Sequence, residues 1–263
     1  MKLFSIGISI IIILFGCNTI LFGQTQEEKG LKIVKKADRL DSGFGSYSCK
    51  MEMSVKSEQG GEIVHHMRFK VKEGKGDGDK SLIVVDEPGN VEGTALMTFT
   101  HKTRLDDQWL FLKAIQRVKK IGYSNMMNGF MESEFAYADL GSNEVEKYRY
   151  TYIRQDTIQT VKMLVVERHP VDPKSGYSKQ VVWYNKINYR IEQIEYYDKK
   201  RIKLKTLKYS DYNQHSGVYW RAHLMVLENH QTNTTTKIKS SDYKFKIGLI
   251  DSDFTEKALT QRN

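Results

Sequence analysis

The chain has 263 residues, of which 40% are hydrophobic and 28% are charged, and its formal net charge is +9. It contains two cysteines, and only Cys49 lies outside the N-terminal segment, which excludes a scaffold held together by disulfide bonds within one chain. A chain of this length can instead bury a hydrophobic core. It has no repeat, no low-complexity block and no linker rich in Pro, Gly or Ser, so we predict a single folded domain over residues 24–263.

Residues 1–23 have the pattern of a signal peptide. Lys2 gives a positive start, a long apolar run follows, and the small residue Gly23 lies at the end. We therefore expect export, with cleavage after Gly23. A second interpretation is a lipobox from Leu14 to Cys17, in which Cys17 becomes a lipidated N-terminus, and a third is a retained membrane anchor.

The excess of basic residues predicts a positively charged surface. Because the protein is expected to be exported, we expect no nucleic acid partner. Anionic lipid headgroups or acidic protein surfaces are the partners that this charge favours. The alternative is a solvated, lysine-rich surface that has no partner.

The first predicted elements are a helix and a hairpin. Residues 27–40 place apolar side chains at helical spacing among lysines, and Asp41 ends the pattern. The period then changes to two, which predicts two strands joined by a turn. The apolar face carries Tyr47, Cys49, Met51, Met53 and Val55 in the first strand and Ile63, His65, Met67, Phe69 and Val71 in the second.

Further strands follow, with one long interruption. Short apolar strands are predicted at residues 81–85, 93–101 and 109–112, and residues 114–140 are predicted to form one or two short helices and an ordered loop. The two-residue period returns between residues 148 and 245. We predict a mainly β (α+β) fold with an antiparallel meander of about ten or eleven strands. Because an open twisted sheet of that size curls, the sheet should be strongly curved.

The sequence gives only weak signals for catalysis or metal binding. The neighbours His65 and His66 point to opposite faces of a strand, so they cannot share a small metal ion. Asp106 and Asp107 lie at a strand end, where carboxylates commonly cap the backbone, and no nucleophile motif accompanies them. We expect no enzymatic activity, no metal and no cofactor.

Residues 106–140 combine three features that favour a binding role. The strand signal contains Trp109 and Phe111, the basic segment contains Arg117, Lys119 and Lys120, and the loop after it contains Met126, Met127 and Met131. Flexible thioethers can repack around ligands of variable shape, so the loop predicts a lid over a binding site. The alternatives are ordinary packing of a short helix for the methionines and a solvated face for the basic residues.

The same region resembles a known family. The segments Glu92–Thr94, Asp106–Leu112, Lys113–Ile121 and Phe130–Leu140 look like the bacterial outer membrane lipoprotein-sorting proteins, whose fold is similar to that of the periplasmic lipoprotein carrier and its outer-membrane receptor. Two local departures are Leu-Lys-Ala at residues 112–114, where the family often has Leu-Pro-Ala, and Glu-Ser where it has Gly-Ser. The resemblance implies an unclosed, strongly curved β-barrel whose open side is covered by a helical lid, with an apolar cavity for acyl chains between them.

The resemblance also implies a function. We expect a monomeric, non-enzymatic carrier in the periplasm of a Gram-negative-type bacterium. It would bind lipid or lipoprotein acyl chains, contact the membrane surface transiently and transfer its cargo toward the outer membrane. Lipidation at Cys17 would instead place it on the outer membrane. The alternative function is a ligand-sensing or accessory module that partners a large membrane export transporter.

Candidate site residues follow from the predicted faces and from the lid. The side chains expected to contact an acyl chain are Met51, Met53, Met67, Phe69, Trp109, Phe111, Met126, Met127, Met131 and Trp220. Those expected to meet headgroups or a partner are Arg117, Lys119 and Lys120. An open cavity and a filled core are both compatible with this pattern.

Overall fold

The structure is a computed structural model, which describes residues 24–56 and 60–260. The predicted signal peptide, its cleavage after Gly23 and the alternative lipidation of Cys17 lie outside the described residues. Within these two ranges, neither helix has the length and apolar character needed to cross a bilayer.

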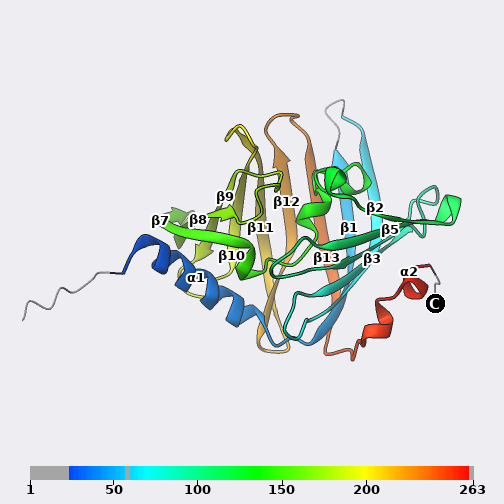
Figure 1. The fold of residues 1–263 in the computed structure, drawn as a ribbon, viewed down its shortest axis with the longest axis horizontal. Coiled ribbons are helices and arrows are strands. Elements are labelled where there is room, and N and C mark those ends of the chain that lie inside the picture. Colours follow the sequence, from blue (N-terminus) through cyan, green and yellow to red (C-terminus); the bar gives the residue numbers. More distant parts are fainter. Residues whose placement is uncertain (1–23, 57–59, 261–263) are drawn as a thin grey trace, which may run out of the picture.

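One curved antiparallel sheet dominates the described part of the chain (Figure 1). Strand β1 (Ser46–Lys56) pairs with both β2 (Glu62–Lys72) and β13 (Thr235–Phe245), so the first and last strands are neighbours in the middle of the sheet. The remaining strands are β3 (Lys80–Glu87), β4 (Ala95–Phe99), β5 (Asp107–Leu112), β6 (Arg117–Lys120), β7 (Tyr148–Ile158), β8 (Val161–Pro170), β9 (Lys179–Asn185), β10 (Ile191–Tyr197), β11 (Lys203–His215) and β12 (Tyr219–Asn229). The predicted unclosed, curved sheet is confirmed, with 13 strands rather than ten or eleven.

The two edges of the sheet are β6 and β7, which are consecutive in the chain. Their connection, residues 121–147, is here named the cover segment. It packs apolar side chains such as Phe130 and Phe135 into the same core cluster as residues from both halves of the sheet. The connection between the edges therefore covers the concave face.

The cover segment is built differently from the prediction of one or two short helices. It contains four single 3₁₀ turns, η2 (Tyr123–Asn125), η3 (Phe130–Glu132), η4 (Tyr137–Asp139) and η5 (Val145–Lys147). A fifth turn, η1 (Lys113–Ile115), precedes β6. The segment's own backbone hydrogen bonds, such as Ala138 N–H to the Met126 carbonyl at 2.9 Å, fold it back on itself. Such short turns lack the repeated apolar spacing that identifies a helix in a sequence.

The predicted N-terminal helix is confirmed as α1 (Gln26–Asp41). Its start is fixed by a capping box, in which the Thr25 hydroxyl accepts from Glu28 N–H and the Glu28 carboxylate accepts from Thr25 N–H, both at 3.1 Å. The helix lies against β7 through Gly30, where an added Cβ would come within 2.8 Å of the Tyr152 nitrogen. Absence of a side chain at this position permits the close approach of helix and strand.

A second small layer covers the opposite, convex face of the sheet at β3 to β5. It consists of η6 (Asp251–Asp253) and α2 (Glu256–Thr260), which pack Phe254 and Leu259 onto the strands. Because side chains alternate along a strand, the same strand contributes apolar residues to both faces. On β4, Leu96 belongs to the concave core, whereas Ala95 and Met97 contact the convex layer.

Candidate ligand-binding cavity

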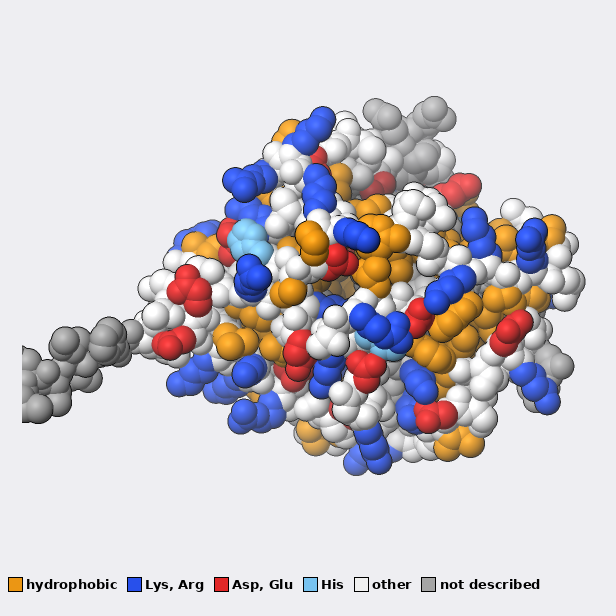
Figure 2. Space-filling model, in the orientation of Figure 1, with side chains coloured by type: hydrophobic (Ala, Val, Ile, Leu, Met, Phe, Trp, Pro, Cys, Tyr) orange, Lys and Arg blue, Asp and Glu red, His pale blue; other side chains and the backbone are white. Residues whose placement is uncertain are grey.

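A cavity of about 820 Å³ lies between the concave face of the sheet, α1 and the cover segment. Hydrophobic side chains are visible in a hollow near the middle of this face, with charged side chains around it (Figure 2). The volume falls within the range of about 300 to 1,000 Å³ that is typical of small-molecule sites. The concave face therefore contains space for a ligand.

One wall of the cavity is apolar. Because alternate residues of β1 and β2 point to the same face, this wall combines thioethers, a thiol and aromatic rings. Its strand residues are Cys49, Met51, Met53, Met67, Phe69, Val71 and Ile83, and the cover segment adds Phe130, Phe135 and Leu140. Burial raises the pKa of the Cys49 thiol to about 12, so this group remains protonated at neutral pH.

The facing wall, from β7 to β11, is rich in tyrosine. Its lining residues include Tyr148, Tyr150, Tyr184, Tyr196, Tyr209 and Tyr212. Burial is the largest cause of the raised pKa of Tyr150, Tyr184, Tyr196, Tyr209 and Tyr212, so these phenols are neutral and offer hydroxyl groups inside the cavity. Sequence reasoning missed this wall, although the alternation of Tyr148, Tyr150 and Tyr152 was an available signal.

Some apolar side chains of the cavity lining are exposed to solvent. Ile187 is 85% exposed, Val218 is 57% exposed, and both also line the cavity. The guanidinium of Arg190 lies 4.3 Å from the Tyr212 ring centroid and 4.5 Å from that of Trp220. Such stacking fixes this arginine in the lining of the cavity.

Carboxylates also line the cavity. Asp41 and Asp79 line the cavity, and burial raises the pKa of both, that of Asp79 to about 6. Glu73 accepts hydrogen bonds from the backbone N–H groups of Gly43 at 2.6 Å and Gly45 at 2.8 Å. The lining of the cavity therefore carries both signs of charge.

The cover segment is tied to the sheet by a buried ion pair. Lys205 Nζ of β11 lies 2.6 Å from Asp139 Oδ2 of η4, and each side chain is only 4% exposed. Lys205 also donates to the Glu134 carbonyl at 2.8 Å, and the Tyr177 hydroxyl donates to Asp139 Oδ1 at 2.8 Å. This arrangement satisfies both charges away from water.

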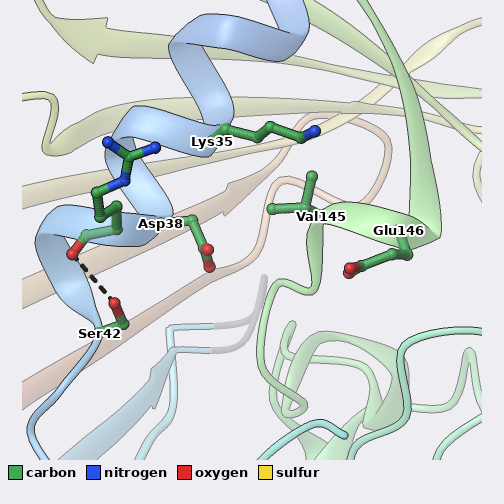
Figure 3. A pocket seen from close by; sticks show the side chains of 6 residues that line it. Lys35, Asp38, Ser42, Val145 and Glu146 are labelled. Carbon is green, nitrogen blue, oxygen red and sulfur yellow. Dashed lines mark hydrogen bonds between the residues drawn. The ribbon is translucent and has the colours of Figure 1, made fainter. Parts of the chain in front are cut away.

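A smaller pocket of about 320 Å³ adjoins α1 (Figure 3). Asp38 of α1 and Glu146 of η5 lie on opposite sides of it, with Lys35 nearby. Burial, followed by the charge of Glu146, raises the pKa of Asp38. Since Asp38 and Ser42 line both pockets, this polar crevice adjoins the main cavity.

The predicted acyl-contact residues fall into three groups. The cavity is lined by Met51, Met53, Met67, Phe69 and Trp220. Met126 and Met131 of the cover segment pack against the core cluster beside the cavity, while Met127 is 36% exposed and lies against Gly176. Trp109 and Phe111 pack on the convex face with Phe254.

Lys120 of the basic segment and the paired aspartates make structural contacts, whereas Arg117 and Lys119 are exposed. Arg117 and Lys119 are exposed on the edge strand β6, and Lys120 forms an ion pair with Asp107 at 2.7 Å. Burial acts to raise the pKa of Asp107, but hydrogen bonds from Lys120, Arg104 and His101 lower it to about 2. Asp106 accepts from Lys147 at 2.7 Å, so both carboxylates hold neighbouring segments together.

The comparisons with known proteins agree with this geometry. A family model described only as an uncharacterized protein matches residues 77–261. A solved domain from Vibrio parahaemolyticus, assigned to outer membrane lipoprotein sorting, is 43% identical with a TM-score of 0.87, and the match covers 89% of this chain and 100% of that one. The chain belongs to the outer membrane lipoprotein-sorting protein family.

More distant structures share the fold. A member of the DUF1329 family from Desulfovibrio piger is 25% identical with a TM-score of 0.85, covering 89% of this chain and 99% of that one. A LolA superfamily protein from Nitrosomonas europaea is 20% identical with a TM-score of 0.70, covering 87% and 98%. No curated protein matches this chain. The overall fold is thus shared with both structures.

Proposed function

We propose that the protein is a periplasmic, non-enzymatic carrier that binds lipid or lipoprotein acyl chains in its cavity and transfers them toward the outer membrane. The observation that supports this most strongly is the 820 Å³ cavity with one wall of thioether, aliphatic and aromatic side chains. Membership of the lipoprotein-sorting family supports the same cargo class.

Burial of apolar surface supplies the driving force for binding. Each methylene group removed from water contributes roughly 0.8 kcal/mol, so two further carbons should tighten binding by roughly tenfold while the cavity has room. No covalent step is needed, and release follows when the chain moves to a site that buries it equally well. The soft methionine side chains of Met51, Met53 and Met67 suit chains of different shape.

The cover segment provides a route for entry. We propose that its methionines Met126, Met127 and Met131 move with it when the cavity opens. The exposed cations Arg117, Lys119 and Lys120 of β6 would meet anionic headgroups during contact with a membrane, an interaction that added salt should weaken.

Titration with single-chain acyl probes of increasing length tests the proposal. We expect affinity to rise with each added pair of carbons and then to level off when the cavity is full. Met225→Glu places a charge in the cavity and should weaken binding at least about tenfold, because the chain would lie against an ionised group.

The matched control is Val226→Glu. Val226 is the next residue of β12, it is also half-buried, and strand alternation points it to the other face. This variant should bind the probes as the unmodified protein does. Affinity that is independent of chain length, or equal loss in both variants, would count against a carrier cavity.

A further inference from the structure

Arg168 of β8 is a buried cation in the wall of the cavity. The residue is 3% exposed, its Nε donates to Gln180 Oε1 at 2.7 Å, and its Nη2 donates to Asn143 Oδ1 at 3.0 Å. The guanidinium also lies 4.5 Å from the centroid of the Tyr148 ring. These contacts hold the side chain in one place.

The guanidinium is charged. Burial acts to lower the pKa of Arg168, but the phenols of Tyr148 and Tyr184 act in the opposite sense and leave the pKa above its ordinary value. Arginine side chains are in any case not deprotonated in proteins. A full positive charge therefore faces the cavity.

This charge has no carboxylate partner within the described ranges. Both hydrogen bonds of the Arg168 side chain go to neutral amides, and Nη1 makes none to the described residues. Other cations near the cavity have carboxylate partners: the buried Lys205 has Asp139, the half-buried Arg221 has Asp41, and the half-buried Arg190 lies 3.5 Å from Glu192. Because an isolated buried charge is costly, an anion at Arg168 would be strongly favoured.

We propose that the cargo is an anionic amphiphile, whose carboxylate or phosphate oxygens accept hydrogen bonds from Arg168 while its acyl chain lies along the wall of Met51, Met53 and Met67. This inference rests on the proposed carrier function and specifies its substrate class. Arginine is suited to the role because its planar group binds oxyanions with directed, charge-assisted hydrogen bonds. A chain with an uncharged head would leave the cation uncompensated.

Three probes with one chain length test the inference on the unmodified protein: a fatty acid, the alkyl phosphate and the fatty alcohol. At pH 8 we expect at least one of the two anions to bind about tenfold or more tightly than the alcohol, since hydrogen bonds to charged groups are the stronger ones. The anion that binds more tightly identifies carboxylate or phosphate as the natural head. An alcohol that binds as tightly as both anions would overturn the inference and leave the carrier function intact, whereas failure of all three to bind would overturn both.

Variants test whether Arg168 causes the preference for anionic probes. Arg168→Gln should abolish the difference between the anions and the alcohol but retain alcohol binding, and Arg168→Lys should keep part of the difference. The matched control is Arg154→Gln, which removes an exposed arginine that lies near Trp183 and does not line the cavity. If Arg168→Gln kept the full preference for anions, the assignment to this residue would be wrong, and if it failed to fold, the comparison of the three probes on the unmodified protein would still decide.

Discussion

The ion pair between Lys205 and Asp139 makes a quantitative prediction about the cover segment. Lys205→Met removes the cation and leaves Asp139, whose side chain is 4% exposed, with the Tyr177 hydroxyl and the Ala136 N–H as its remaining donors among the described residues. Removing one partner of a buried pair typically costs about 3 to 5 kcal/mol. Because the pair joins the cover segment to β11, the loss should appear first as opening of the cover.

Hydrogen exchange of the cover amides measures this opening. The N–H groups of Tyr137 and Ala138 donate to the Asn128 and Met126 carbonyls, so they are protected while the segment is folded. In Lys205→Met their protection should fall by roughly 100-fold or more, since about 1.4 kcal/mol corresponds to a factor of ten. Amides of β1, which is separated from β11 by β12 and β13 and is held by its own pairing with β2 and β13, should change less.

Two further variants test whether the burial of the Lys205–Asp139 pair causes the loss of protection. Lys203→Met breaks a pair of similar length on the same strand, 2.6 Å from Glu195, but Lys203 is 39% exposed, so it should cost less than about 1 kcal/mol. The double variant Lys205→Met with Asp139→Leu removes both charges and should recover much of the loss. Equal protection of the cover amides in Lys205→Met and Lys203→Met would show that burial of the Lys205–Asp139 pair does not hold the cover segment closed.

Two other predictions concern stability. Gly30→Ala should lower the free energy of unfolding by roughly 1 to 2 kcal/mol despite the better helix propensity of alanine, because its Cβ would press on the Tyr152 backbone. Lys32→Ala changes an exposed residue of the same helix and is the control. Equal stability of the two variants in urea would contradict the close packing of α1 on β7. Asp79→Asn should stabilise the protein at pH 8 by up to roughly 2 kcal/mol, because burial raises the pKa of Asp79 to about 6 and its ionised form disfavours folding above that pH. This gain in stability should shrink as the pH falls from 6 to 4. Asp251→Asn should not produce a gain, since hydrogen bonds from Lys80 and Lys72 lower the pKa of Asp251. A gain in Asp79→Asn that does not depend on pH would contradict a raised pKa at Asp79.

Much of the fold could be predicted from local patterns. Alternation in β1 and β2 identified the apolar face that carries Met51, Met53 and Met67, and the helical spacing of residues 27–40 identified α1. These signals are local because each strand or helix buries one face. The pairing of β1 with β13 and the placement of β6 and β7 at the two edges depend on contacts distant in sequence, which periodicity does not report.

The candidate site was harder to predict for the same reason. Trp109 and Phe111 carry a strong apolar signal, but alternation alone does not say which face of β5 is concave, and both pack beneath Phe254. Arg168 reads in the sequence as an ordinary strand cation, because its burial depends on Asn143 of the cover segment and on Gln180 of the next strand. The spacing of residues in the sequence does not indicate that Asn143 and Gln180 are its partners.

Native mass spectrometry of the protein, purified without detergent from cells that export it, measures whether lipid occupies the cavity. We expect a complex of one protein with one lipid, which loses the lipid on gentle activation and is depleted in Met225→Glu but not in Val226→Glu. A population that carries no lipid, and that also takes up no acyl probe when one is supplied, would contradict the proposed carrier function.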